Sequence, residues 1–277
     1  YNIALMAEAG INVSINSDSA DIIRHFNTEF HKPMRWGGMT ESEAIKLVTL
    51  NPAMQLGIAD RCGSLEVGKD GDVAIFNGPP GNSFSKCVMT VIEGEVYYQA
   101  EAIEPAPSAG AQGGTVKRSP PRRTELGRGE KAIYAITGAT VHPVSGPPIP
   151  NGTVVIRDGR IAAVGTGVQV PSDATVVDAT GLHVYPGLID CGSTLSLQEI
   201  DSLRATRDNR DIADFMPDLT AISAVNPHSA HIPNTRTAGV TSTLTKPSGG
   251  YVSGQSAHIR LAGWTAPEMT VQQSWAL

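Results

Sequence analysis

The spacing of apolar residues predicts a helical region near the start of the chain. Apolar and polar residues alternate over residues 11–16, which predicts a short strand. Apolar residues at helical spacing then predict one helix over residues 19–35. Thr40 followed by Glu43 is typical of the capping box that begins a helix. A helix over residues 44–49 and a shorter one over 52–56 are therefore predicted next.

The rest of the pattern predicts strands. Short runs rich in β-branched residues lie at 73–76, 88–92, 96–98, 132–137, 153–157, 160–164, 175–178, 183–185, 240–245 and 257–261. Glu93-Gly94 and Asp158-Gly159 stand between neighbouring runs and favour the tight turns of hairpins. The chain is therefore predicted to be α/β, with its helices before residue 57 and its strands mostly after it.

A segment without apolar periodicity separates the two groups of strands. Residues 100–131 are rich in Pro, Gly and Ala, and such a composition cannot bury enough surface to offset its ordering entropy. We predict a flexible linker there, and hence domains over 1–99 and 132–277. Its basic residues favour a solvated linker over a site for an anionic partner; they are Lys117, Arg118, Arg122, Arg123 and Arg128.

Composition is that of a globular α/β chain. Hydrophobic residues make up 40% and charged residues 17%, with a formal net charge of −6. The net negative charge argues against a nucleic-acid-binding surface. A membrane-spanning helix needs about 20 consecutive apolar residues, and no run in the sequence approaches that length. Cys62, Cys87 and Cys191 lack paired spacing and are predicted to be reduced, packed thiols. Neither a compartment nor an oligomeric state is indicated.

Several ordered motifs carry a family resemblance. Residues 138–142 (GATVH), 152–161, 177–181 and 186–190 (PGLID) resemble the opening of a metal-dependent amidohydrolase of the imidazolonepropionase-like branch. Ser17-Asp18, residues 49–57 (TLNPAMQLG) and residues 63–72 resemble the ending of the same family. The ending therefore precedes the opening. We predict a piece of a tandem protein, with the end of one copy followed by the start of a second.

The resemblance implies a fold for each copy. The family's (β/α)8 TIM barrel carries a small β-sandwich built from both chain ends, and such a barrel takes about 250 residues. This chain is therefore expected to hold barrel pieces and an incomplete barrel. Each group of sandwich strands would otherwise expose an apolar face, so we predict that strands within 65–98 pair with strands within 132–185 across the linker.

The resemblance also implies an activity. The family hydrolyses non-peptide C–N bonds of small amides, cyclic amides or amines with water activated by a divalent metal, often zinc. Asp18 matches the family's carboxylate on the last barrel strand, which makes it the candidate catalytic residue and a candidate metal ligand. The alternative is that Asp18 caps a helix beginning near Ser19. His25 and His31 are interpreted as surface or packing residues.

The second copy departs from the family pattern. Gly192 and Thr194 stand where the first barrel strand carries two metal-binding histidines, and alternation points Cys191 away from that face. A metal site of the usual kind is therefore not expected there, and the piece alone is not expected to be catalytic. His228 and His231 are interpreted as loop residues. The alternative function for the whole protein is a catalytically degenerate barrel that acts as a binding or scaffold module.

Overall fold

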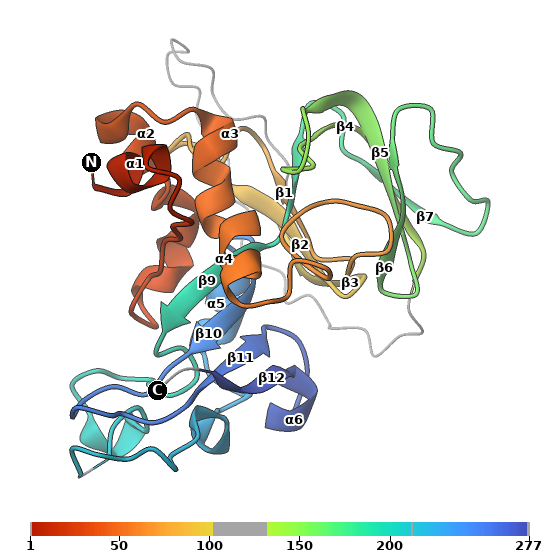
Figure 1. Cartoon of the computed structure of the whole chain (residues 1–277). Coiled ribbons are helices and arrows are strands. Elements are labelled where there is room, and N and C mark those ends of the chain that lie inside the picture. The colour runs from red at the N-terminus through yellow and green to blue at the C-terminus, as the bar shows by residue number, and fades with distance from the viewer. Residues whose placement is uncertain (1, 102–131, 212, 276–277) are drawn as a thin grey trace, which may run out of the picture.

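The computed structural model describes residues 2–101, 132–211 and 213–275, which form two sheets and a group of short helices (Figure 1). Most of the predicted linker and its basic cluster lie outside the described residues. Among the helices of the described ranges, none has the length and apolar character needed to cross a bilayer.

The larger sheet has eight strands. Its order is β3-β2-β1-β8-β4-β5-β6, and β7 pairs with β4. The strands are β1 (Val73–Phe76), β2 (Cys87–Ile92), β3 (Glu95–Gln99), β4 (Tyr134–Val141), β5 (Ile149–Arg157), β6 (Arg160–Gly165), β7 (Thr175–Asp178) and β8 (His183–Pro186). All eight coincide with predicted runs to within a few residues. Asp158 (φ 53°) and Gly159 (φ 77°) make the predicted turn between β5 and β6, both left-handed.

The pairing of β1 with β8 joins the two sides of the linker. The strands are antiparallel, with Val73 opposite Pro186 and Phe76 opposite His183. This confirms the predicted pairing across the linker. β1 is buried on both faces: Val73 and Ile75 belong to the apolar core of the larger sheet, while Ala74 and Phe76 belong to a second core. One four-residue strand therefore contributes to both cores.

The smaller sheet has the order β12-β11-β10-β9. Its strands are β9 (Leu188–Ser193), β10 (Val240–Thr245), β11 (Ser256–Arg260) and β12 (Thr270–Trp275). β9 and β10 are parallel, and the other neighbours are antiparallel. The connection between the parallel strands includes η3 (Arg204–Thr206), η4 (Ala221–Ala224) and α5 (His231–Arg236), while α6 (Ala266–Met269) precedes β12. No sheet of the described residues closes into a barrel.

The helices before β1 are short. They are α1 (Asn2–Glu8), η1 (Ile22–Thr28), α2 (His31–Gly37), α3 (Glu41–Ala44), η2 (Ile45–Val48) and α4 (Leu50–Gln55). The prediction of one helix over 19–35 is wrong. Proline has no backbone N–H, so Pro33 cannot donate the helical hydrogen bond to the carbonyl of Glu29, four residues earlier. The helical region is accordingly interrupted between η1, which ends at Thr28, and α2, which begins at His31. The capping box is confirmed, since Thr40 Oγ1 accepts from Glu43 N and Glu43 Oε2 accepts from Thr40 N.

The predicted strand at 11–16 keeps its alternation without joining a sheet. Val13 and Ile15 are buried while Asn12 and Asn16 are exposed, as a strand would have them. Side chains of α4 take up the backbone groups that a neighbouring strand would pair. Asn51 Nδ2 donates to Val13 O (2.7 Å), and Gln55 Nε2 donates to Asn12 O (2.8 Å). The residues therefore lie extended against a helix.

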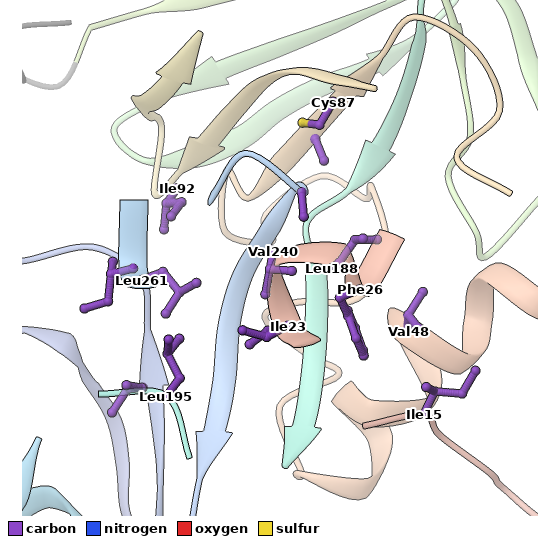
Figure 2. Close-up of a cluster of buried hydrophobic side chains, with 14 of the residues drawn as sticks. Ile15, Ile23, Phe26, Val48, Cys87, Ile92, Leu188, Leu195, Val240 and Leu261 are labelled. Carbon is purple, nitrogen blue, oxygen red and sulfur yellow. The ribbon is translucent and has the colours of Figure 1, made fainter. Parts of the chain in front are cut away.

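A second apolar core lies between the smaller sheet and the helices. Figure 2 shows Leu188 and Val240, from the parallel strands, beside Ile23 and Phe26 from η1. Phe26 is fully buried. Burying one such side chain stabilises a fold by roughly 1.5–3 kcal/mol. This core therefore fixes the residues before β1 against strands that follow the linker.

A polar stack also joins the two sides of the linker. His142 Nε2 and His183 Nδ1 lie 3.0 Å apart, and the His142 ring stacks on Tyr185 with centroids 4.1 Å apart. The Tyr185 hydroxyl donates to Glu41 Oε1 (2.9 Å) at the start of α3. Burial, with a smaller contribution from the neighbouring His183, lowers the pKa of His142 to about 4. The pair of rings requires at least one neutral histidine, because two imidazolium rings have only donors.

Gly187 provides a test of the crossing between the sheets. It lies between β8 and β9, and a Cβ at Gly187 would lie 2.2 Å from Thr241 Cγ2. We expect Gly187→Ala to destabilise the chain by about 1–3 kcal/mol in urea unfolding because β9 must move away from β10. Gly146→Ala is the control, since a Cβ there meets nothing within 4 Å. Equal stability of the two variants would contradict this account of the crossing.

His142 provides a test of the stack. Its folded-state pKa of about 4 lies below the ordinary value of 6.5, so its contribution is present above pH 6.5 and is lost as the pH falls toward 4. We expect His142→Phe, which keeps a ring on Tyr185, to lose less stability than wild type between pH 7 and pH 5. The His142 ring is partly exposed, and solvent therefore screens its interactions. We expect the two proteins to differ by about 1 kcal/mol in the stability that they lose over this pH range.

The comparison of wild type with variant is needed because other groups titrate in the same range. Burial raises the pKa of Asp72 and Asp190 to about 7, and these carboxyls favour the folded state as the pH falls. Burial also holds the pKa of His258 at about 4. His25→Phe, at an exposed histidine on η1, should leave the wild-type pH profile unchanged. A His142→Phe profile parallel to that of wild type would count against the stack.

Candidate active site

Asp18 lies where the parallel strands of the smaller sheet end. Its backbone N–H donates to Gly192 O (2.9 Å), so the end of the 11–17 segment lies beside the end of β9. Asp18 has a left-handed backbone (φ 60°), which Asp tolerates better than most residues. Its side chain is 72% exposed. The carboxylate is therefore accessible at the edge where barrel enzymes place their active sites.

The buried carboxylate of Asp190 supports the backbone next to Asp18. Asp190 on β9 is fully buried. Its Oδ1 accepts from the backbone N–H groups of Ser17 and Gly192, each at 3.1 Å, and its Oδ2 accepts from Ser17 Oγ. Burial raises the pKa of Asp190 to about 7, against the opposing effect of these donors. Asp190 thereby ties Ser17, the residue before Asp18, to the first strand of the smaller sheet.

Lys246 is the residue that sequence reasoning missed. It follows β10 directly, and its backbone N–H donates to Ser193 O (2.9 Å). Its Nζ lies 2.6 Å from Asp18 Oδ1. The sequence does contain a signal for it: Lys246 stands directly after a predicted strand, and the carboxyl ends of barrel strands carry functional side chains. The site is thus an ion pair above a buried carboxyl.

Asp18 is not the cap of the following helix: the N-cap residue of η1 is Asp21, and no side chain accepts a capping hydrogen bond there. The backbone N–H of Asp21, at the start of η1, donates to Ser19 Oγ (3.1 Å). The Asp18 side chain instead pairs with Lys246. The structure therefore directs Asp18 across to β10, away from its own helix.

The two positions that resemble metal-ligand positions carry no metal donor set. Gly192 has no side chain, and Thr194 Oγ1 accepts the backbone N–H of Ala20 (3.3 Å). Within the described ranges, no three His, Cys, Asp or Glu side chains are grouped so as to hold a metal ion. Both oxygens of Asp190 already accept hydrogen bonds. These residues do not fit a divalent metal in this arrangement.

The histidines considered from the sequence lie apart from Asp18. His25 and His228 are exposed, and His31 Nδ1 lies 3.4 Å from Ser83 Oγ. His231 Nε2 lies 2.7 Å from Glu199 O, and its Nδ1 lies 3.9 Å from Asp21 Oδ1. All of these contacts are with residues other than Asp18. The surface or packing interpretation agrees with the positions of His25 and His31, and His228 lies in a turn as expected, but His231 is the first residue of α5 and its interpretation as a loop residue is wrong.

The cysteines are free thiols, as predicted. Cys191 packs against the apolar group that includes Ala53 and Leu56, on the face of β9 opposite Asp190. Burial raises the pKa of its thiol to about 11. Cys191 is therefore directed into packing and away from the ion pair.

Comparisons with known proteins identify the family to which part of this chain is similar. Residues 1–117 match the model of the amidohydrolase family. Amidohydrolase tasK of Hapsidospora irregularis is 27% identical over 190 residues, which are 64% of this chain and 19% of that protein. Imidazolonepropionase of Thermoplasma acidophilum is 29% identical over 99 residues, 33% of this chain and 24% of the relative. The resemblance stated from the motifs is confirmed.

Two further similarities are of the same kind. Enamidase of Eubacterium barkeri is 34% identical over 87 residues, 31% of this chain and 22% of the enamidase. A solved amidohydrolase from Thermotoga maritima superposes with a TM-score of 0.47 at 28% identity, covering 50% of this chain and 36% of that one. The chain thus spans no more than about a quarter of the length of the curated relatives named here.

Ser17 provides a test of the buried support. Ser17→Ala removes one donor from the buried Asp190 carboxyl. We expect a loss of about 1–3 kcal/mol in urea unfolding, because a buried acceptor loses its partner. Ser42→Ala, at an exposed position in α3, is the control and should change stability little. If Ser17→Ala were as stable as this control, the Asp190 bonds would not hold the segment before Asp18.

Proposed function

We propose that this chain, a relative of the amidohydrolase family, is part of a hydrolase that cleaves non-peptide C–N bonds in a small amide, cyclic amide or amine. The support is the match of residues 1–117 to the family and the similarity to proteins named imidazolonepropionase, enamidase and N-acyl-D-aspartate deacylase. Proteins of these names are hydrolases that act on C–N bonds.

We also propose that the chain holds parts of two family copies. Residues 1–99 would be the end of the first copy, 100–131 the linker, and 132–277 the start of the second. The order of the motifs supports this division, because the ending of the family pattern precedes its opening. The β9–α5–β10 connection, with its parallel strands, is consistent with the beginning of a (β/α)8 barrel.

Asp18 is the proposed catalytic residue. The observation that carries this role is its place: an exposed carboxylate at the carboxyl ends of parallel strands, held 2.6 Å from the Lys246 ammonium. Asp18 would take the proton of the water that attacks the substrate carbon and return it to the departing nitrogen.

A divalent metal belongs to the proposal for the whole protein. The amidohydrolase family generally uses divalent metals, and we propose zinc, with Asp18 as a candidate ligand in the first copy. When bound, such an ion lowers the pKa of a water ligand toward neutrality. The described residues around Asp18 do not form a donor set for it, so the remaining ligands would come from strands outside this chain.

The test is Asp18→Asn in the full-length protein. We expect hydrolysis of the best substrate from a panel of N-acyl amino acids, cyclic imides and imidazolones to fall by at least about 100-fold, because proton transfer is lost. Asp21→Asn, at an exposed aspartate three residues later, is the matched control and should retain activity. The thermal unfolding of both variants would be measured beside the rates.

Two outcomes would contradict the proposal. Full activity in Asp18→Asn would remove the catalytic role of this residue. Absence of hydrolysis across the panel by wild-type protein, together with tight binding of one of its members, would favour the degenerate barrel that binds without cleaving.

A further inference from the structure

We propose that Lys246 takes the place of a metal ion at this edge of the smaller sheet. In this proposal its stem fills the space of a ligand side chain at position 192, and its ammonium supplies the positive charge that Asp18 faces. The described arrangement would therefore exclude divalent metals by its own residues, and Asp18 could hold the zinc proposed for the first copy only where Lys246 does not face it. The argument stands on the geometry of the described chain and does not depend on hydrolysis.

The first step is the space above Gly192. A Cβ at this position would lie 3.2 Å from Lys246 Cε, 3.5 Å from Lys246 Cδ and 3.1 Å from Asn16 Nδ2. The contacts with Lys246 Cε and Asn16 Nδ2 are tighter than usual and call for a shift of a few tenths of an ångström, whereas the contact with Lys246 Cδ is ordinary van der Waals contact. A histidine at 192 would have to extend its ring beyond that Cβ, through the volume that the lysine stem holds. The lysine and the absence of a ligand side chain are therefore two parts of one packing arrangement.

The second step is the charge. Lys246 Nζ lies 2.6 Å from Asp18 Oδ1, the distance of a charge-assisted hydrogen bond. A metal ion bound to Asp18 would stand within a few ångströms of the ammonium. Like charges at this distance repel, and water screens the repulsion only in part, so a metal ion would bind Asp18 more weakly beside the ammonium than without it.

The third step is the anchoring of Lys246. Its backbone N–H bonds Ser193 O, and the residue before it bonds Leu195 O through Thr245 Oγ1 (2.7 Å). The hydroxyls of Ser193 and Thr243 lie 2.9 Å apart between the same strands. The root of the side chain is thus fixed to β9 on one side and β10 on the other. Lys246 can leave Asp18 only by turning its side chain out to solvent.

The test is a titration with Co²⁺, whose visible spectrum reports ligation without any substrate. The 277-residue chain, freed of metal with a chelator, would be compared with Gly192→His/Thr194→His and with the triple variant that adds Lys246→Ala. We expect no 1:1 binding by wild type, and binding by the triple variant at least about 10-fold tighter than by the double variant. Far-ultraviolet circular dichroism would confirm that all three are folded.

Each other outcome overturns the proposal. Equal affinity of the double and triple variants would show that Lys246 does not exclude the metal, as would a folded triple variant that binds none. The wild-type titration needs no variant to fold: 1:1 Co²⁺ binding that Asp18→Asn abolishes would show that the site accepts a metal beside the lysine. Because the readout is ligation, failure of the proposed hydrolysis would leave this result unaffected.

Discussion

The antiparallel pairing of β1 with β8 is the constraint on which the rest of the structure depends. β1 precedes residues 102–131 and β8 follows them, so their ladder brings the two described parts of the chain into one sheet. Gly187 then passes the chain directly from β8 into β9, with its N–H on Asp72 O (2.9 Å). The position of the smaller sheet, and with it the site at Asp18, follows from this crossing (Figure 1).

The strands could be predicted from the sequence because their signals are local. β1, β7 and β10 are rich in β-branched residues, and Asp158-Gly159 makes the turn that its residues favour. The segment at 11–16 shows where local signals end. Its alternation correctly predicts that Val13 and Ile15 are buried, although Ile11 is exposed. Whether a strand or a helix pairs with its backbone depends on Asn51 and Gln55, about forty residues away.

The residues of the site likewise differ in whether they could be predicted from the sequence. Asp18 could be proposed from its motif, which needs only neighbouring residues. Its partner could not, because Lys246 lies 228 residues later and meets Asp18 only through the register of β9 with β10. Asp190 shows the intermediate case. Its place in the PGLID motif was visible, while its bonds to Ser17 depend on the packing of the extended segment against β9.

The order of the motifs along the chain and their arrangement in space are consistent with each other. In a closed barrel the last strand lies beside the first. Here the segment at 11–17, which resembles a last barrel strand, ends against β9, which resembles a first barrel strand. The segment at 11–17 nevertheless precedes β9 in the sequence by about 170 residues. The two segments therefore contact each other as the last and first strands of a closed barrel would. Asp18 follows the one segment, and beside Gly192 of the other lies the stem of Lys246, which follows β10.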